Sequence, residues 1–234
     1  KVSFTQHTWL LVTGSMPSDA QTRALDAALV AIAEHGLVPS VQAARITYAA
    51  APEAVQGAVA AGILGCGSVI LGAAEAAGAF LQQCIDAGGD RRSAIEKVVS
   101  DLRSQKKAIP GYGHPYHKAH DPRTGRLIEV ARELGVFGEH LETALLAEKV
   151  IPEITGRALV LNVSGAIPSL LLDAGYPLLG MKGVPILART ASLIAHILEE
   201  RSNPIGFALT EAGSEVISYS GEVPEGFVAQ GVGE

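Results

Sequence analysis

The sequence predicts an all-α protein, and three observations support this prediction. Apolar residues recur at helical spacing along most of the chain, as in Leu25, Ala28, Leu29 and Ile32. Only 5% of the 234 residues are aromatic, while glycine occurs 26 times and alanine throughout. Small residues of this kind suit close helix packing better than a β-sandwich, whose strands favour aromatic and β-branched side chains. Residues typical of helix starts and ends flank the periodic runs.

The individual helices follow from these signals in chain order. Ser18 with Gln21 three residues later has the spacing of a capping box, and Gly36 ends the helix that begins there. Pro52 suits the first turn of a helix that reaches Leu64. The other predicted helices span residues 39–45, 68–87, 90–107, 124–134, 139–154, 164–174 and 185–201.

The overall charge and the cysteines narrow the class of protein. With a formal net charge of −6, the surface as a whole does not attract nucleic acid or an anionic membrane. Cys66 and Cys84 are too few for a disulfide framework and form no C-x-x-C pair, which predicts a reducing, cytoplasmic location. The chain begins at Lys1 with neither an initiator methionine nor a signal-peptide pattern, so we expect residues upstream of it.

One uncharged stretch, residues 54–74, has the length of a membrane span. Gly65-Cys66-Gly67-Ser68 interrupts it, Glu53 and Glu75 bracket it, and no aromatic or basic anchor lies immediately beside it. We therefore expect two buried helices that meet at a tight turn, and no membrane partner.

The segment from Val99 to Arg126 is the most informative part of the chain. Residues 109–115 at its centre are too rich in glycine and proline for a helix. Six basic side chains against two acidic ones give the segment a formal charge of +4. Free backbone N–H groups and nearby cations stabilise anions together, which indicates a site for a phosphorylated or carboxylated ligand. A solvated basic face is the alternative.

Several short motifs resemble those of citrate synthases and occur in the same order. Pro110-Gly111-Tyr112-Gly113-His114 resembles the P-G-[FY]-G-H loop, and Asp121-Pro122-Arg123 places its arginine nine residues after the histidine, as the family does. Further matches are residues 10–17 to LL-x-G-x-x-P, 34–37 to the DHG segment, 162–163 to the start of NVD, and 189–196 to R-x-x-G-x-x-x-H. The chain therefore resembles the citrate synthase superfamily along nearly its whole length, and most closely its citryl-CoA lyase branch.

This resemblance implies a citrate synthase-like fold. A large helical domain of residues 1–70 and 176–234 would carry an inserted small helical domain, 71–175, that closes over the ligand. The chain would form a homodimer or a higher homo-oligomer. The tail from residue 203 is expected to wrap a partner or to fray.

The resemblance also implies ligands and site residues. Coenzyme A would bind as the substrate thioester, without a metal, along Lys106, Lys107, Ala108, Ile109, Pro110, Gly111, Tyr112 and Gly113. His114 would polarise the carbonyl or hydroxyl group of a keto acid or hydroxy acid. His35, Arg123 and Arg189 would hold its carboxylates, because the planar guanidinium binds a carboxylate through two bonds.

Each candidate also has a structural alternative. His114 alone reads as a hydrogen-bonded structural residue, His35 as a cap of a helix C-terminus, and Arg189 as part of an intersubunit salt bridge. His114, His117 and His120 have a three-residue spacing that forms a metal-binding face on a helix. The prolines around them oppose a regular helix, and the nearby cations oppose a divalent ion.

Three positions depart from the citrate synthase pattern. Ile70 stands where the family has a catalytic histidine in L-H-G-G-A, and Ser164 stands where it has the general-base aspartate of N-V-D. No arginine matches the family's R-P near residues 202–206. A serine hydroxyl does not remove the α-proton of an acyl-CoA at neutral pH unless another base activates it. These losses favour retro-aldol cleavage, with His114 or His35 as the base and Ser164 ordering a water or the thioester oxygen.

The sequence therefore predicts a CoA-thioester-dependent carbon–carbon lyase or condensing enzyme. Its substrate would be citryl-CoA or a related 3-hydroxyacyl-CoA, cleaved to an acyl-CoA and a keto acid. A less carboxylated acyl-CoA is consistent with the missing arginine. The alternative function is a CoA-binding regulatory or assembly subunit without catalysis. His114, Arg123 and Arg189 count against it, because a binder has no need of a carboxylate-holding set.

Overall fold

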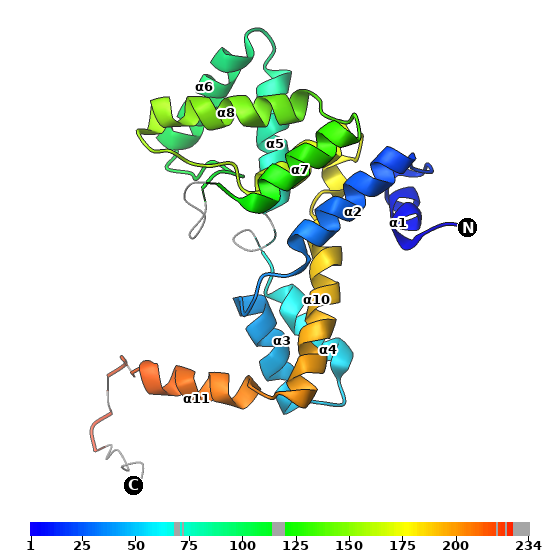
Figure 1. The fold of residues 1–234 in the computed structure, drawn as a ribbon. Helices are drawn as coiled ribbons and strands as arrows, with labels where there is room; N and C mark the ends of the chain where they lie inside the picture. The colour runs from blue at the N-terminus through cyan, green and yellow to red at the C-terminus, as the bar shows by residue number, and fades with distance from the viewer. Residues whose placement is uncertain (68–70, 72, 114–119, 219, 223, 227–234) are drawn as a thin grey trace.

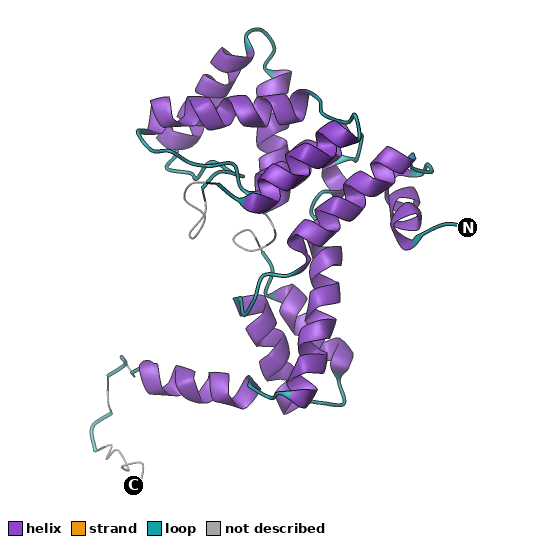
Figure 2. Cartoon of the chain, viewed as in Figure 1, coloured by secondary structure: helices purple, strands orange, loops and turns teal. Residues whose placement is uncertain are grey.

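The computed structural model describes residues 1–67, 71, 73–113, 120–218, 220–222 and 224–226. Within these residues the structure has eleven α-helices, one 3-10 helix, two isolated β-bridges and no strand (Figure 2). The all-α prediction is confirmed. The elements are α1 (Phe4–Thr13), α2 (Asp19–Ala33), α3 (Pro39–Ala50), α4 (Val55–Leu64), α5 (Ala73–Asp86), α6 (Arg91–Ser104), α7 (Pro122–Glu133), α8 (Glu139–Thr155), α9 (Val163–Asp173), η1 (Leu178–Gly180), α10 (Gly183–Ser202) and α11 (Gly206–Val216).

The helices form two groups joined by long elements (Figure 1). Helices α5 to α8 lie together at the top of the view, and α3 and α4 pack on each other and on α10 at the bottom. Helix α10 runs between the two groups and packs against α2, while α11 contacts α3 and projects to the side. The candidate site described below lies where these groups meet.

Four clusters of buried apolar residues hold this arrangement together. The central cluster joins α1, α2, α9 and α10 around Trp9, Leu25 and Leu170. A second cluster packs α5, α6 and α8, and two small clusters lie between α3, α4 and α10. The central cluster mixes residues from both predicted domains, such as Leu25 and Leu170. The division at residues 70 and 175 stays a prediction.

The local helix signals explain why most elements begin where they do. Ser18 caps α2 as predicted: its Oγ accepts the Gln21 N–H at 3.2 Å, and Gln21 Oε1 accepts the Ser18 N–H at 2.9 Å. Ser3 and Gln6 repeat this capping box at α1. A side-chain cap stabilises a helix by about 1 kcal/mol.

Three predicted elements were wrong in part. Helix α3 continues to Ala50, and α4 begins only at Val55, so Pro52 lies in the turn before the helix. The helix predicted over 68–87 begins at Ala73. Leu71 has a left-handed backbone (φ +70°) and bridges to Gly67, whereas residues 68–70 and 72 lie outside the described residues.

The tail from residue 203 was expected to wrap a partner or to fray, but Gly206–Val216 forms the helix α11. Contact of the tail with a partner stays a prediction. The Glu200 carboxylate accepts the N–H groups of Ile205 and Gly206 at 2.7–3.1 Å and so caps α11 from the preceding helix. Such a cap satisfies backbone groups that a helix end otherwise leaves without partners.

One described segment, Leu178–Ser202, has the length and composition of a membrane span. A helix in the core of a folded domain passes the same test, and the buried side chains of α10 pack against α2, α3 and α4. The absence of a membrane partner stays a prediction.

Candidate active site

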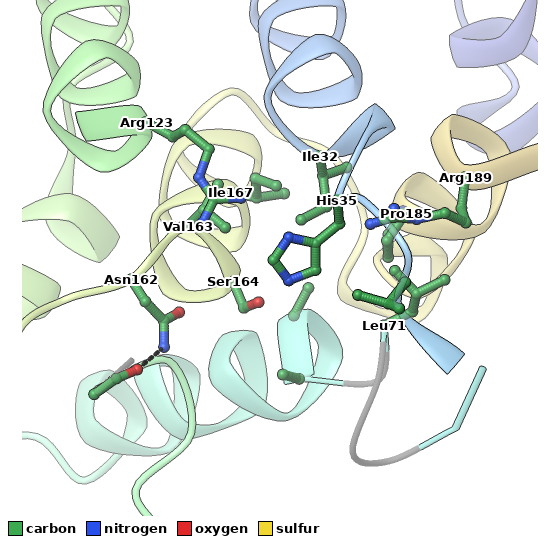
Figure 3. Close-up of a pocket in the computed structure, with 14 residues that line it drawn as sticks. Ile32, His35, Leu71, Arg123, Asn162, Val163, Ser164, Ile167, Pro185 and Arg189 are labelled. Carbon is green, nitrogen blue, oxygen red and sulfur yellow. Dashed lines mark hydrogen bonds between the residues drawn. The ribbon is translucent and has the colours of Figure 1, made fainter. Parts of the chain in front are cut away.

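A pocket of about 320 Å³ lies between α2, α5, α7, α9 and α10 (Figure 3). Its polar lining comes from His35, Arg123, Asn162, Ser164 and Arg189. Apolar side chains form the rest of the wall, including Ile32, Val38, Leu71, Ala74, Ile167 and Pro185. The pocket thus brings together four predicted site residues that lie far apart in the sequence: His35, Arg123, Ser164 and Arg189.

Arg123 lies at the start of α7 and lines the pocket, and the N-cap residue of α7, Asp121, holds its side chain. Asp121 is 1% exposed and accepts two hydrogen bonds from the Arg123 guanidinium. Arg123 Nε donates to Asp121 Oδ1 at 3.0 Å, and Arg123 Nη2 donates to Asp121 Oδ2 at 2.8 Å. Asp121 Oδ2 also accepts the Val163 N–H at the start of α9, at 3.1 Å. Burial raises the pKa of Asp121, but the bonds and charge of Arg123 outweigh it and leave the pKa below its ordinary value. Asp121 therefore balances the Arg123 charge and fixes α7 against α9.

The glycine-rich loop before His114 is bonded to the start of α9. Gly113 N–H donates to the Val160 carbonyl at 2.8 Å, and Asn162 N–H donates to the Gly111 carbonyl at 2.9 Å. The Asn162 side chain also donates to the Gly113 carbonyl at 2.7 Å. Gly111 has φ +85°, and a Cβ on it would lie 2.8 Å from the Cα of Gly165. Only glycine at position 111 allows the loop to lie this close to Gly165 in α9. In this position of the loop, the backbone at Gly113 forms part of the pocket wall.

Arg189 differs from Arg123 because no carboxylate in the described part of the chain forms an ion pair with it. It is 1% exposed on α10, and within the described residues its Nε and Nη1 have no hydrogen-bond partner. Burial, ahead of any charge effect, lowers the pKa of Arg189, although a guanidinium stays charged at neutral pH. A buried cation without partners is costly. An anionic ligand in the pocket would satisfy it.

His35 lies in the loop between α2 and α3, and its ring points into the pocket in Figure 3. Partial burial lowers the pKa of His35, and the positive charges of Arg189 and Arg123 lower it further. The imidazole is therefore neutral at pH 7 and can accept a proton.

Ser164 occupies the first turn of α9, and its side chain lines the pocket near the His35 ring (Figure 3). The N-terminus of a helix carries partial positive charge. The hydroxyl group and the helix end together suit a carbonyl oxygen or a developing oxyanion.

The remaining predicted residues lie elsewhere. Lys106, Lys107 and Ala108 are exposed between α6 and the glycine-rich loop. Ile109 and Tyr112 pack in the core cluster of α5, α6 and α8, where the Tyr112 hydroxyl donates to the Ala144 carbonyl at 2.9 Å. Their side chains are therefore unavailable to a ligand, and only the backbone of that loop can follow one. Among the loop positions predicted to bind CoA, Gly113 lines the pocket, whereas Pro110 and Gly111 do not.

His114, His117 and Ile70 lie outside the described residues, so the predicted roles of His114 and the departure at Ile70 stay predictions. Within the described residues, no three His, Cys, Asp or Glu side chains gather as metal ligands would. The pocket residues that the sequence analysis did not name are mostly apolar. In the sequence, only their position beside the family motifs could have placed them at the site.

A family model described as the citrate synthase C-terminal domain matches residues 1–206. The chain belongs to the citrate synthase family. This confirms the family resemblance predicted from the ordered motifs.

Individual relatives locate the chain within the citrate synthase family. Citryl-CoA lyase from Hydrogenobacter thermophilus is similar with a TM-score of 0.87 and 34% identity, over 97% of this chain and 88% of that chain. ATP citrate lyase from Methanothrix soehngenii, solved with citrate and coenzyme A, has a TM-score of 0.75 and 23% identity, over 97% of this chain and 38% of that one; at this identity it shows the fold alone. Citrate synthase of Heyndrickxia coagulans is 28% identical over 215 residues, 86% of this chain and 53% of that protein. The chain spans about half the length of the citrate synthases it matches by sequence.

Leu71 offers a test of the pocket wall. A left-handed backbone costs a residue with a side chain about 1 kcal/mol that glycine avoids. Leu71→Gly and Leu71→Ala both remove the isopropyl end of the side chain, but only glycine, which has no Cβ, also removes the strain. We expect Leu71→Gly to be more stable than Leu71→Ala by about 1 kcal/mol in urea unfolding. Equal stabilities would contradict the left-handed geometry at φ +70°.

Proposed function

We propose that this chain is a CoA-thioester-dependent carbon–carbon lyase that cleaves citryl-CoA, or a related 3-hydroxyacyl-CoA, to an acyl-CoA and a keto acid. The observation that carries the proposal is the convergence of His35, Arg123, Ser164 and Arg189 on one pocket. The described lining of that pocket contains two arginines and no carboxylate, which suits a carboxylated substrate. The similarity to a citryl-CoA lyase supports the same reaction class.

Arg189 is the first anchor for the substrate. A substrate carboxylate at this residue gains a charged, two-bond contact and supplies the partners that Nε and Nη1 lack in the described residues. Arg123, whose charge Asp121 balances, suits a hydrogen bond to a second oxygen better than it suits a second full charge. With Arg189 as the main carboxylate anchor, the pocket also suits a substrate with fewer carboxylates. Such a substrate is consistent with the absence of the family's R-P arginine near residues 202–206.

The bond-breaking step requires a base for the 3-hydroxyl group. As the base takes this proton, the hydroxyl oxygen becomes the keto oxygen and the adjacent C–C bond breaks. The bonding electrons pass to the acyl-CoA fragment as an enolate, which takes up a proton to give the acyl-CoA. His35 suits the role of base because its imidazole is neutral. Ser164 and the N-terminus of α9 suit the thioester oxygen, where negative charge develops. His114 is the other candidate base.

The CoA part of the substrate is proposed to follow the loop 106–113. The exposed Lys106 and Lys107 suit its phosphates, and the backbone of the glycine-rich loop leads from them to the pocket at Gly113.

A panel of CoA thioesters that includes citryl-CoA, with products followed by mass spectrometry, tests the reaction. We expect cleavage by the wild-type chain and a fall in turnover of about 10²- to 10⁴-fold when the general base is removed. His35→Ala and His114→Ala, measured in parallel, identify the base. Unchanged cleavage in His114→Ala rules out His114. Because the pKa of His35 lies below 6.5, a rate that depends on its neutral form should rise with pH below 6.5 and level off above it.

The alternative function, a CoA-binding subunit without catalysis, is favoured by one observation. Ser164 stands in place of the family aspartate, and the described lining of the pocket supplies no carboxylate base. Tight binding of CoA thioesters without turnover of any of them would support this alternative.

A second copy of this chain is the proposed oligomeric partner. Large apolar side chains are exposed on α10 and α11 and just beyond α11, namely Leu198, Phe207, Val216 and Ile217 at 59–82%. Apolar surface of this kind favours a protein interface. We expect Phe207→Glu to shift the chain from dimer to monomer in size-exclusion chromatography with light scattering. Val30→Glu on α2, equally exposed at 78%, is the matched control and should leave the dimer intact.

A further inference from the structure

Glu34 and His196 form a side-chain pair just outside the pocket. Glu34 is the C-cap residue of α2 and immediately precedes His35, and His196 belongs to α10. Both carboxylate oxygens of Glu34 lie 3.1 Å from His196 Nε2. Glu34 Oε1 also accepts the Gly36 N–H at 2.5 Å. The carboxylate of Glu34 thus ties both sides of His35 to α10.

Other bonds hold the loop beyond Gly36, where the Val38 N–H donates to the Gly36 carbonyl at 2.8 Å and Gln42 Nε2 donates to the Leu37 carbonyl at 2.7 Å. The Glu34 carboxylate holds the two residues that flank His35 itself. Residues 34–38 are not helical, and Gly36 turns the chain with φ +66°. Within the described residues, the His35 ring has no hydrogen-bond partner. The backbone around it therefore determines where the imidazole lies.

Helix α10 carries both His196, which bonds Glu34, and Arg189, the proposed anchor for the substrate carboxylate. Arg189 and His196 are seven residues apart on α10, about two turns, so they lie on nearly the same side of the helix. The other ring nitrogen of His196, Nδ1, lies 3.4 Å from the Glu199 carboxylate but has no hydrogen-bond partner among the described residues. The contact of the His196 ring with Glu34 is therefore its hydrogen-bonded contact in the described part of the chain.

From this geometry we infer that His196 is a positioning residue: through Glu34 it sets where His35 lies relative to Arg189. His196 lines no part of the pocket and touches no reacting group. The inference assumes, from the proposed function, only that His35 acts in the pocket.

The charge environment of His35 provides a readout of its position. The nearby groups are Arg189 on α10, Arg123 and Asp121 at the start of α7, and Glu34. Partial burial and the two arginines lower the pKa of His35, and the two carboxylates oppose them. When the imidazole moves out of the pocket, its pKa rises toward 6.5.

His196→Leu, compared with His196→Gln, tests the inference in the full-length chain. The pKa of His35 is measured from its imidazole signals by NMR titration. Leucine removes the donor, so the pKa of His35 should rise toward 6.5; glutamine can still donate to Glu34 and should keep the wild-type value. His140→Leu is the matched control. The side chain of His140 is 12% exposed and pairs with Asp173 at 2.8 Å, and that of His196 is 13% exposed, so the two histidines are similarly buried. The loss of His140 should not move the His35 signals.

An unchanged pKa of His35 in His196→Leu would overturn the inference. If that variant does not fold, Glu34→Asp serves instead. It keeps the charge, but its shorter side chain cannot reach both Gly36 and His196, so the same rise is expected.

Turnover distinguishes this inference from the proposed function. In an active enzyme, His196→Leu should lower kcat about tenfold while KM changes little, since Arg189 still anchors the carboxylate. A wild-type chain that turns over no thioester, but shows the His35 shift in His196→Leu, would overturn the lyase and support the positioning role. If the wild-type chain turns over a thioester and the pKa of His35 is unchanged in His196→Leu, the lyase function is supported and the positioning role of His196 is overturned.

Discussion

Arg189→Met is expected to make the ligand-free protein more stable and to weaken its binding of carboxylated ligands strongly. Arg189 is 1% exposed, and two of its nitrogens have no partner among the described residues. A buried donor without a partner costs about 1–3 kcal/mol, so replacing this guanidinium with an apolar side chain of similar size should stabilise the protein by about that amount. The methionine fills the same volume and has no unmet hydrogen bonds.

The loss of binding should be large. Removing one partner of a desolvated charged pair costs about 2–5 kcal/mol, so the Kd for the carboxylated substrate that we propose, with citrate as the probe, should rise about 30-fold or more. Isothermal titration calorimetry measures the Kd, and urea unfolding of the ligand-free chain measures the stability.

Arg189→Lys is the control for the binding geometry. It keeps the charge without the planar fork, so binding should be weakened but detectable. A methionine variant that binds as well as the wild type would show that the substrate carboxylate lies elsewhere. A variant that is both weaker in binding and less stable would mean that Arg189 supports the fold.

The helices could be predicted wherever their signals are local. Helix α2 begins at its capping box of Ser18 and Gln21, and both residues lie within four positions of each other. Helix α11 could not be predicted, because its N-terminus is capped by Glu200 from α10. The glycines around Cys66 predicted the turn after α4, but the start of the next helix was predicted at residue 68, whereas α5 begins at Ala73.

The site could be predicted only as far as the motifs reach. The motifs identified Arg123 and Arg189 alike as carboxylate-binding residues, and the structure places both at the pocket. It also distinguishes them, since Asp121 pairs with Arg123, whereas Nε and Nη1 of Arg189 have no described hydrogen-bond partner. No sequence spacing distinguishes those two states. The tie between Glu34 and His196 spans 162 positions, so it too required the fold.

Arg45→Met is expected to have the largest effect on stability, with the sign opposite to that of Arg189→Met. Arg45 is 2% exposed, and each of its three guanidinium nitrogens donates a hydrogen bond: to Glu200 at 2.6 Å, to Glu199 at 2.9 Å and to the Asn203 carbonyl at 2.8 Å. The change leaves Glu200, 3% exposed, as a buried carboxylate without its cation. Breaking such a pair costs about 3–5 kcal/mol. Urea unfolding of both methionine variants in one series measures the contrast.

The pH dependence of stability adds a second test of this ion pair. Burial raises the pKa of Glu200, but the N–H of Gly206 and the Arg45 guanidinium outweigh it and bring the pKa below 4.5. A carboxyl whose folded pKa is depressed stabilises the fold above its unfolded pKa, and this contribution is lost as the pH falls through the folded value. The wild type should therefore lose this stabilisation below pH 4.5. In Arg45→Met the carboxyl protonates more readily, so the gap between the two proteins should narrow as the pH falls below 4.5. A constant gap across that range would mean that Arg45 acts through packing rather than through its charge.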